Sequence, residues 1–122
     1  MIRTMIVDDE RLARQEIKRL LESFSEIEVI AESGVVDEAL DIIEKEKPDL
    51  LLLDIQMPGK NGFELMTKIR GHNPSIIGIY MTGDPDRFLP RLKEEQNRHQ
   101  VDFICKPFSL SELSMVLSKL QD

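Results

Sequence analysis

Short apolar runs alternate with amphipathic segments along the whole chain. Five runs are predicted to be strands, at residues 3–7, 27–31, 50–53, 76–81 and 101–105. In the segments that follow them, apolar residues recur every three or four positions, which indicates helices that bury one face. Strands and amphipathic helices in this alternation predict an α/β domain whose parallel sheet is covered on both sides.

The first three helical segments are defined by their apolar stripes and their ends. The first is predicted from about residue 10 to 23, and its stripe consists of Ala13, Ile17, Leu20, Leu21 and Phe24. The stripe of the second consists of Val36, Ala39, Leu40 and Ile43. Gly71 is expected to end the third helix, because glycine readily adopts the left-handed conformation that follows a last turn. Glu28 interrupts the second strand, which favours an edge position for it.

The last helical segment has the clearest start signal. Ser109 and Glu112 are spaced as a capping box, and Phe108 and Leu113 are spaced as a hydrophobic staple. Leucines at 110, 113, 117 and 120 are predicted to line one face of this helix.

The segment between the fourth and fifth strands has the weakest pattern. Pro90 lacks an N–H and is disfavoured inside a helix. Only Phe88, Leu89 and Leu92 are candidates to pack inward, and residues 93–100 contain no apolar side chain. We therefore expect this helix to start late, near residues 87–89, or to be kinked and loosely held.

Composition narrows the class of protein. The 122 residues, 41% hydrophobic and 32% charged, suit one globular domain with a real core. A formal net charge of −7 argues against nucleic acid binding by this domain. The single Cys105 cannot form an internal disulfide, and no apolar run is long enough to span a membrane. We expect a cytoplasmic protein without a signal peptide or a membrane partner.

Acidic residues follow two of the predicted strands. Asp8 and Asp9 come after the first strand, and Asp54 comes after the third. If these strands are neighbours in a parallel sheet, the three carboxylates emerge at the same edge, where ligands of open α/β sheets bind. Crowded carboxylates repel one another and commonly hold a hard cation such as Mg²⁺. Alternatively, the first acidic pair serves only to favour the start of a helix through its dipole.

Four motifs at strand ends carry a family resemblance. They are Ile6-Val7-Asp8-Asp9-Glu10, Leu53-Asp54-Ile55-Gln56-Met57-Pro58-Gly59, Thr82, and Lys106-Pro107-Phe108. Taken singly, each has an ordinary explanation as a cap, a turn, a strand end or a solvated lysine. In this order, the chain resembles the receiver domain of two-component response regulators. The resemblance covers nearly all residues and implies a flavodoxin-like (βα)5 doubly wound parallel sheet with strand order 2-1-3-4-5.

The resemblance also implies a metal site. Asp9 and Asp54 would bind Mg²⁺ directly, Asp8 would act through water, and Gln56 would offer its backbone carbonyl.

The remaining site residues are implied to handle the phosphoryl group. Asp54 would be the phosphoacceptor, since carboxylates can attack phosphorus. Lys106 would pair with one phosphoryl oxygen and Thr82 would donate a hydrogen bond to another. A cis peptide bond before Pro107 would aim the lysine.

A switch is implied on the far strands. Thr82 would move toward the phosphoryl group, and Phe103 would turn inward behind it, changing a face made of helix four, strand five and helix five. That face could bind an output partner or form a homodimer. Plain core packing is the alternative reading for Phe103. Gln56 and Asp84 occupy positions that tune dephosphorylation in similar proteins.

The sequence thus predicts a domain that accepts a phosphoryl group on Asp54 with Mg²⁺, without turnover of an external substrate. His72 and His99 lie in polar segments, so the donor histidine is expected on a partner histidine kinase or phosphotransfer protein. Two alternatives remain: a phosphatase with an aspartyl nucleophile, and a receiver-like interaction module that is never phosphorylated. The phosphatase is disfavoured because Gln56 stands where such enzymes place a second aspartate. No output domain is expected within residues 1–122.

Overall fold

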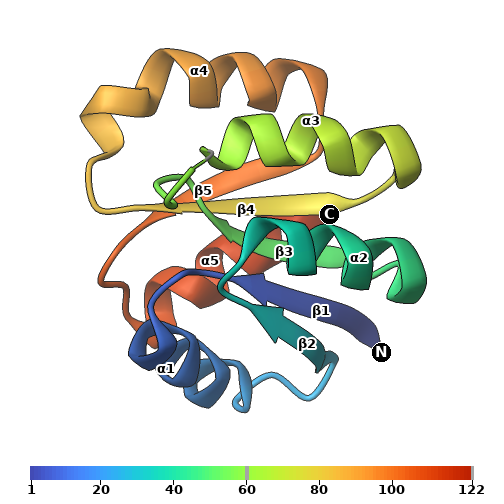
Figure 1. Cartoon of the computed structure of the whole chain (residues 1–122). Coiled ribbons are helices and arrows are strands. Elements are labelled where there is room, and N and C mark those ends of the chain that lie inside the picture. Colours follow the sequence, from blue (N-terminus) through green and yellow to red (C-terminus); the bar gives the residue numbers. More distant parts are fainter. Residues whose placement is uncertain (60, 122) are drawn as a thin grey trace.

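The computed structural model describes residues 1–59 and 61–121 and alternates strands and helices throughout (Figure 1). The strands are β1 (Ile2–Val7), β2 (Ile27–Ser33), β3 (Leu50–Asp54), β4 (Ile77–Thr82) and β5 (Val101–Cys105). The helices are α1 (Arg11–Leu21), α2 (Val36–Glu46), α3 (Gly62–His72), α4 (Pro85–Arg98) and α5 (Leu110–Gln121).

All five strands are parallel, and their order is β2-β1-β3-β4-β5. This confirms the predicted sheet and places β2 at an edge. The strand order reverses at β1: β2 is added on one side of it, and β3, β4 and β5 are added on the other. In such open sheets, ligands bind at the carboxyl ends of the strands beside this point.

Apolar side chains form one cluster on each face of the sheet. One cluster packs β-strand residues against α2, α3 and α4, and the other packs them against α1 and α5 (Figure 1). β3 is buried along its whole length, as expected for a run of four leucines with helices on both sides.

The start of α4 differs from the prediction. The helix begins at Pro85 rather than near residues 87–89, and it contains Pro90. Proline suits the first helical position because its φ is already helical. Pro90 lies on the exposed side of the helix, where water can bond the carbonyl of Asp86 that lacks an N–H donor. An exposed proline near the start therefore did not displace the helix.

The second half of α4 is anchored by a charged residue, Glu95. The residue is 4% exposed although it lies in the segment without apolar residues. Glu95 accepts hydrogen bonds from the Tyr80 hydroxyl of β4 and from Arg70 of α3, the latter at 2.8 Å. Together with fully buried Leu92, this contact fastens a helix that was expected to be loosely held.

Two smaller expectations were also wrong, and a third is confirmed. α3 continues through Gly71 to His72. Leu110 is exposed, so the buried face of α5 consists of Leu113, Val116, Leu117 and Leu120 instead. The capping box of Ser109 and Glu112 is present as predicted, with both reciprocal hydrogen bonds.

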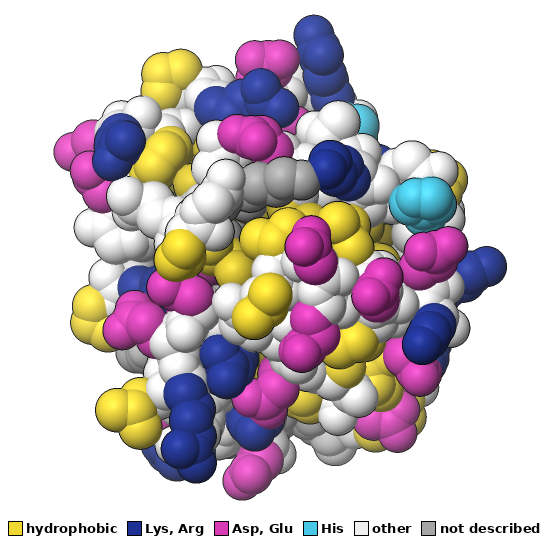
Figure 2. All heavy atoms as spheres, in the orientation of Figure 1, with side chains coloured by type: hydrophobic (Ala, Val, Ile, Leu, Met, Phe, Trp, Pro, Cys, Tyr) yellow, Lys and Arg dark blue, Asp and Glu magenta, His cyan; other side chains and the backbone are white. Residues whose placement is uncertain are grey.

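The described surface carries mixed charges. In Figure 2, basic and acidic side chains are interspersed over the visible face, and no continuous basic stripe crosses it. None of the described helices combines the length and apolar composition that crossing a bilayer requires.

Candidate functional site at the carboxyl edge of the sheet

The predicted site residues meet because each lies at a strand end. β3 ends at Asp54 and β4 ends at Thr82, while Asp8 and Lys106 directly follow β1 and β5. Val7 pairs with Leu53 across β1 and β3, which brings Asp8 next to Asp54. The amide of Lys106 donates to the carbonyl of Thr82 at 2.8 Å, continuing the β4–β5 pairing into the loop.

The three predicted acidic ligands form one cluster. Asp8, Asp9 and Asp54 each offer a carboxylate oxygen, and these oxygens lie within 4.8 Å of one another. Oxygens opposite each other around Mg²⁺ are about 4 Å apart, given metal–oxygen distances of about 2.1 Å. The donor set, three carboxylates gathered within 4.8 Å, therefore fits a hard divalent cation that draws these oxygens slightly closer together. Asp8 and Asp54 are buried, and Asp9 faces the solvent.

Lys106 lies across this cluster. The Lys106–Pro107 peptide bond is cis, as predicted. The Lys106 Nζ is 2.6 Å from Asp8 Oδ2 and 3.7 Å from Asp54 Oδ2. Burial disfavours the ammonium charge, but the hydrogen bond to Asp8 and the charge of Asp54 outweigh burial and raise the pKa of Lys106. The lysine is thus a fixed cation beside Asp54.

Asp54 is electrostatically strained by its surroundings. It is 6% exposed, and among the described residues its Oδ1 accepts one long hydrogen bond, from the Gln56 amide at 3.3 Å. Burial, opposed by the charge of Lys106 and reinforced by Asp8 and Asp9, raises the pKa of Asp54 to about 6. A carboxylate in this state gains most from a cation that would offset the surrounding negative charge.

Thr82, Asp84 and Phe103, the other predicted residues, differ in burial and in what they contact. Thr82 is fully buried, and its Oγ1 accepts the Asp84 amide at 2.9 Å. The Asp84 side chain is exposed. Phe103 pairs with Tyr80 between β5 and β4, and its half-buried ring packs against the cluster under α2, α3 and α4. In this conformation Phe103 takes part in core packing.

An open cavity of about 330 Å³ lies over the cluster. Its lining comprises Asp9, Glu10, Asp54, Gln56, Gly83 and Lys106. The loop after Asp54 stays close because Gly62 has no side chain: a Cβ there would lie 2.9 Å from the Asp54 carbonyl oxygen. The Gly62 amide donates to the Ile55 carbonyl at 2.7 Å and closes this loop.

Two further residues at the site were missed by sequence reasoning. Glu10 lines the cavity, and its Oε1 is 3.9 Å from the Lys106 Nζ. Arg14 donates to the main-chain carbonyl of Asp8 at 2.6 Å. Glu10 could have been found from its place directly after the acidic pair. The Arg14 contact to a main-chain atom has no signature in the sequence.

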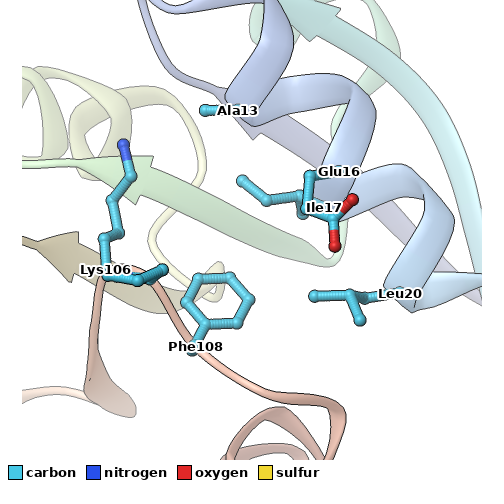
Figure 3. A pocket seen from close by; sticks show the side chains of 7 residues that line it. Ala13, Glu16, Ile17, Leu20, Lys106 and Phe108 are labelled. Atoms are coloured by element: carbon cyan, nitrogen blue, oxygen red, sulfur yellow. The ribbon is translucent and has the colours of Figure 1, made fainter.

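An apolar hollow of about 160 Å³ lies beside the cluster, between α1 and the loop from β5 to α5. Figure 3 shows Phe108 facing Ile17 and Leu20 of α1, with the side chain of Lys106 extending past them. The hollow therefore shares Lys106 with the acidic cavity.

Comparison with known proteins decides the family. The model of the response regulator receiver domain matches residues 4–118. The chain belongs to the response regulator receiver domain family. The receiver domain predicted from the four motifs is thereby confirmed, together with its five-stranded flavodoxin-like fold.

Curated relatives of this receiver domain are longer proteins. It is 37% identical over 120 residues to the sensory transduction protein LytT of Bacillus anthracis, covering 98% of this chain and 47% of that protein. It is 33% identical over 122 residues to the transcriptional regulatory protein BtsR of Escherichia coli K12, covering 99% and 48%. The chain thus spans about half the length of these relatives.

Solved structures agree on the fold. The receiver domain of AraT from Geobacillus stearothermophilus has a TM-score of 0.83 and 27% identity, covering 98% of this chain and 92% of that one. The response regulator PhyR of Brucella abortus has a TM-score of 0.82 and 32% identity, covering 98% and 47%.

Proposed function

We propose that this receiver domain accepts a phosphoryl group on Asp54 from a phosphohistidine of a histidine kinase or phosphotransfer protein. The observation that carries the proposal is the position of the Asp54 carboxylate. It lies at the floor of an open cavity, 3.7 Å from a fixed ammonium and next to two further carboxylates. Family membership supports the same role for this edge of the sheet.

A divalent cation belongs to the proposal. Asp8, Asp9 and Asp54 would hold Mg²⁺, with the backbone carbonyl of Gln56 as a further oxygen ligand at the cavity wall. When bound, the cation would offset the negative charge of the cluster and of the incoming phosphoryl oxygens.

The protein residues would supply positioning. An Asp54 carboxylate oxygen attacks phosphorus, the phosphorus–nitrogen bond to the donor imidazole breaks, and the bonding electron pair leaves with that nitrogen. Lys106 pairs with one phosphoryl oxygen. Thr82 would rotate its hydroxyl from the Asp84 amide toward another. Phosphoryl transfer depends on such positioning and charge neutralisation more than on covalent help from the protein.

The readout proposed for this receiver domain is a change on the far strands. Movement of Thr82 would open space behind β4, and Phe103, now half buried, would move further inward. The face of α4, β5 and α5 would then differ in affinity for an output partner or a second copy. Gln56, which lines the cavity, and the exposed Asp84 would tune the lifetime of the acyl phosphate.

A donor protein and a cellular location are part of the same proposal. A donor protein must reach Asp54 from the open edge, and the apolar hollow beside Lys106 offers it contact area (Figure 3). We assign no partner nucleic acid to this domain, in keeping with its net charge of −7, and no turnover of an external substrate. A cytoplasmic location suits the unpaired Cys105.

Phosphorylation by a small donor tests the proposal. The protein is incubated with acetyl phosphate and Mg²⁺, and its intact mass and the base lability of any adduct are recorded. We expect a single base-labile phosphoryl adduct that is absent from Asp54→Asn and present in Asp84→Asn. An unmodified wild-type mass would favour the interaction module that is never phosphorylated. Steady release of phosphate from small phosphoesters would favour the phosphatase.

A further inference from the structure

Arg14 connects three elements around the acidic loop. This side chain of α1 is 15% exposed, and its guanidinium forks between two oxygens. Its Nε donates to Glu32 Oε1 of β2 at 2.9 Å, and its Nη1 donates to the main-chain carbonyl of Asp8 at 2.6 Å. Lys18, one turn further along α1, forms an ion pair with the second carboxylate oxygen of Glu32.

The contact to Asp8 completes the fixation of that residue. The Asp8 amide donates to the Ser33 carbonyl at 3.0 Å. Its carboxylate accepts from the Glu10 amide at 2.9 Å and from Lys106 at 2.6 Å. The Arg14 guanidinium holds the one remaining polar atom, the carbonyl that joins Asp8 to Asp9.

Gly34 provides the room for this guanidinium. A Cβ at position 34 would lie 2.7 Å from Arg14 Nη1, 3.3 Å from the Asp8 carbonyl oxygen and 3.5 Å from the Asp9 Cα. The guanidinium is the end of a flexible side chain, so it would move away from such a methyl group more easily than the backbone would. A glycine between β2 and α2 is therefore part of the same contact.

We propose that Arg14 is a positioning residue for the cation site. It fixes the peptide between Asp8 and Asp9, so that both carboxylates are already oriented before a cation binds. This inference rests on the proposed function, because it assigns a role toward the cation that the acidic cluster would hold. Groups that orient metal ligands from behind commonly change metal affinity about 10- to 100-fold when they are removed.

Charge and geometry predict opposite effects for the loss of Arg14. Removing a positive charge near the cluster would strengthen cation binding, whereas loosening the loop would weaken it. The effect of charge and the effect of loop geometry can be separated with two variants in which the positive charge is retained. Arg14→Lys retains the charge, but a single ammonium cannot reproduce the fork between Glu32 and the Asp8 carbonyl. Gly34→Ala retains Arg14 and displaces its guanidinium.

Calorimetric titration with Mg²⁺ alone tests the proposal on the folded chain, with Lys18→Ala as the matched control. We expect Arg14→Lys and Gly34→Ala to bind Mg²⁺ about tenfold more weakly. Lys18→Ala removes the other cation on Glu32 without touching Asp8 and should stay within about twofold of the wild type. Hydrogen exchange of the Glu10 amide in EDTA gives a second readout. It should be faster in Arg14→Lys and Gly34→Ala than in Lys18→Ala.

The possible outcomes distinguish a failure of the role of Arg14 from a failure of the proposed function. Equal Mg²⁺ affinity and equal Glu10 exchange in the wild type, Arg14→Lys and Gly34→Ala would overturn the role of Arg14 and leave the proposed function standing. A wild-type chain that binds no Mg²⁺ would overturn the proposed function itself. Urea unfolding in EDTA verifies that each variant is folded.

Discussion

Two buried carboxylates lie in opposite electrostatic states in this receiver domain. Asp54 at the end of β3 is 6% exposed, and Glu95 of α4 is 4% exposed. Burial disfavours the ionised form of both carboxyl groups and so acts to raise both pKa values. At Asp54 the neighbouring carboxylates reinforce this effect against the charge of Lys106, and the pKa rises to about 6. At Glu95 the hydrogen bonds from Arg70 and Tyr80 outweigh burial and hold the pKa below its usual value.

The difference shows that burial alone does not mark a reactive carboxylate. Glu95 accepts two hydrogen bonds on Oε1, and Arg91 is 3.8 Å from its Oε2, so its charge fastens α4 to β4 and α3. Asp54 shares one ammonium with Asp8 and Glu10, so its charge remains incompletely neutralised. An incoming cation can relieve that imbalance, whereas the charge of Glu95 is already offset by Arg70 and by the Tyr80 hydroxyl. Perturbed carboxylates in a cavity are functional candidates for this reason.

The largest effect is expected from neutralising Glu95. Glu95→Gln would leave Arg70 without its carboxylate and should lower the unfolding free energy at pH 7 by about 3 kcal/mol. Because the folded pKa is depressed, the stabilisation by Glu95 is present above its ordinary pKa of 4.5 and is lost as the pH falls through the lower folded value. Urea unfolding at pH 7 and pH 3 measures both effects.

Glu94→Gln is the matched control for this change. Glu94 is the exposed neighbour on α4, and its carboxylate is 3.7 Å from Arg98. Its neutralisation should alter stability by less than about 0.5 kcal/mol. Equal losses in the two variants would contradict the anchoring role of Glu95.

The same carboxylate-to-amide change at Asp54 should have the opposite sign. Asp54→Asn is expected to raise the unfolding free energy of the metal-free protein at pH 7 by about 2 kcal/mol, because it removes a charge that folding disfavours. The folded pKa is raised, so the ionised form costs stability above about pH 6, and this cost disappears as the pH falls toward 4. Wild type and Asp54→Asn should therefore converge near pH 4.

Asp41→Asn, on the exposed side of α2, controls for the substitution itself and should change stability little. A destabilised Asp54→Asn at pH 7 would contradict the strained state assigned to Asp54.

Mg²⁺ should also distinguish the Asp54 and Glu95 variants, through a smaller change in the free energy of unfolding. At ten times its dissociation constant, Mg²⁺ is expected to stabilise the wild type by about 1.4 kcal/mol. Glu95→Gln should gain as much, because its site is intact, whereas Asp54→Asn should gain less. Thermal unfolding in EDTA and in Mg²⁺ measures the gain. A gain of equal size in Asp54→Asn would place the cation elsewhere.

The predictable part of the molecule follows from chain direction. Parallel strands bring their carboxyl ends to one edge, so Asp8, Asp9 and Asp54 could be placed together from their positions after apolar runs. Thr82 and Lys106 were placed there by the family motifs. Family motifs added the cis Lys106–Pro107 bond, which the structure contains. Periodicity was sufficient for the acidic cluster because its residues lie at or directly after strand ends.

The remaining features depend on contacts that periodicity does not encode. Glu95 meets Tyr80 and Arg70, which are 15 and 25 residues away, so a segment without apolar residues gave no sign of an anchor. The start of α4 was misplaced because Pro90 was weighed without knowing that it faces solvent. Arg14 depends on the space left by Gly34, which exists only in three dimensions.

The most direct test of the contrast is to titrate both carboxyl groups in one sample. Carbon-13 NMR of the side-chain carboxyls of the metal-free protein gives the pKa values of Asp54 and Glu95 together. The account predicts a midpoint of about 6 for Asp54 and a midpoint below 4.5 for Glu95. An Asp54 midpoint near its ordinary value of 3.8, or a Glu95 midpoint above that of Asp54, would contradict it.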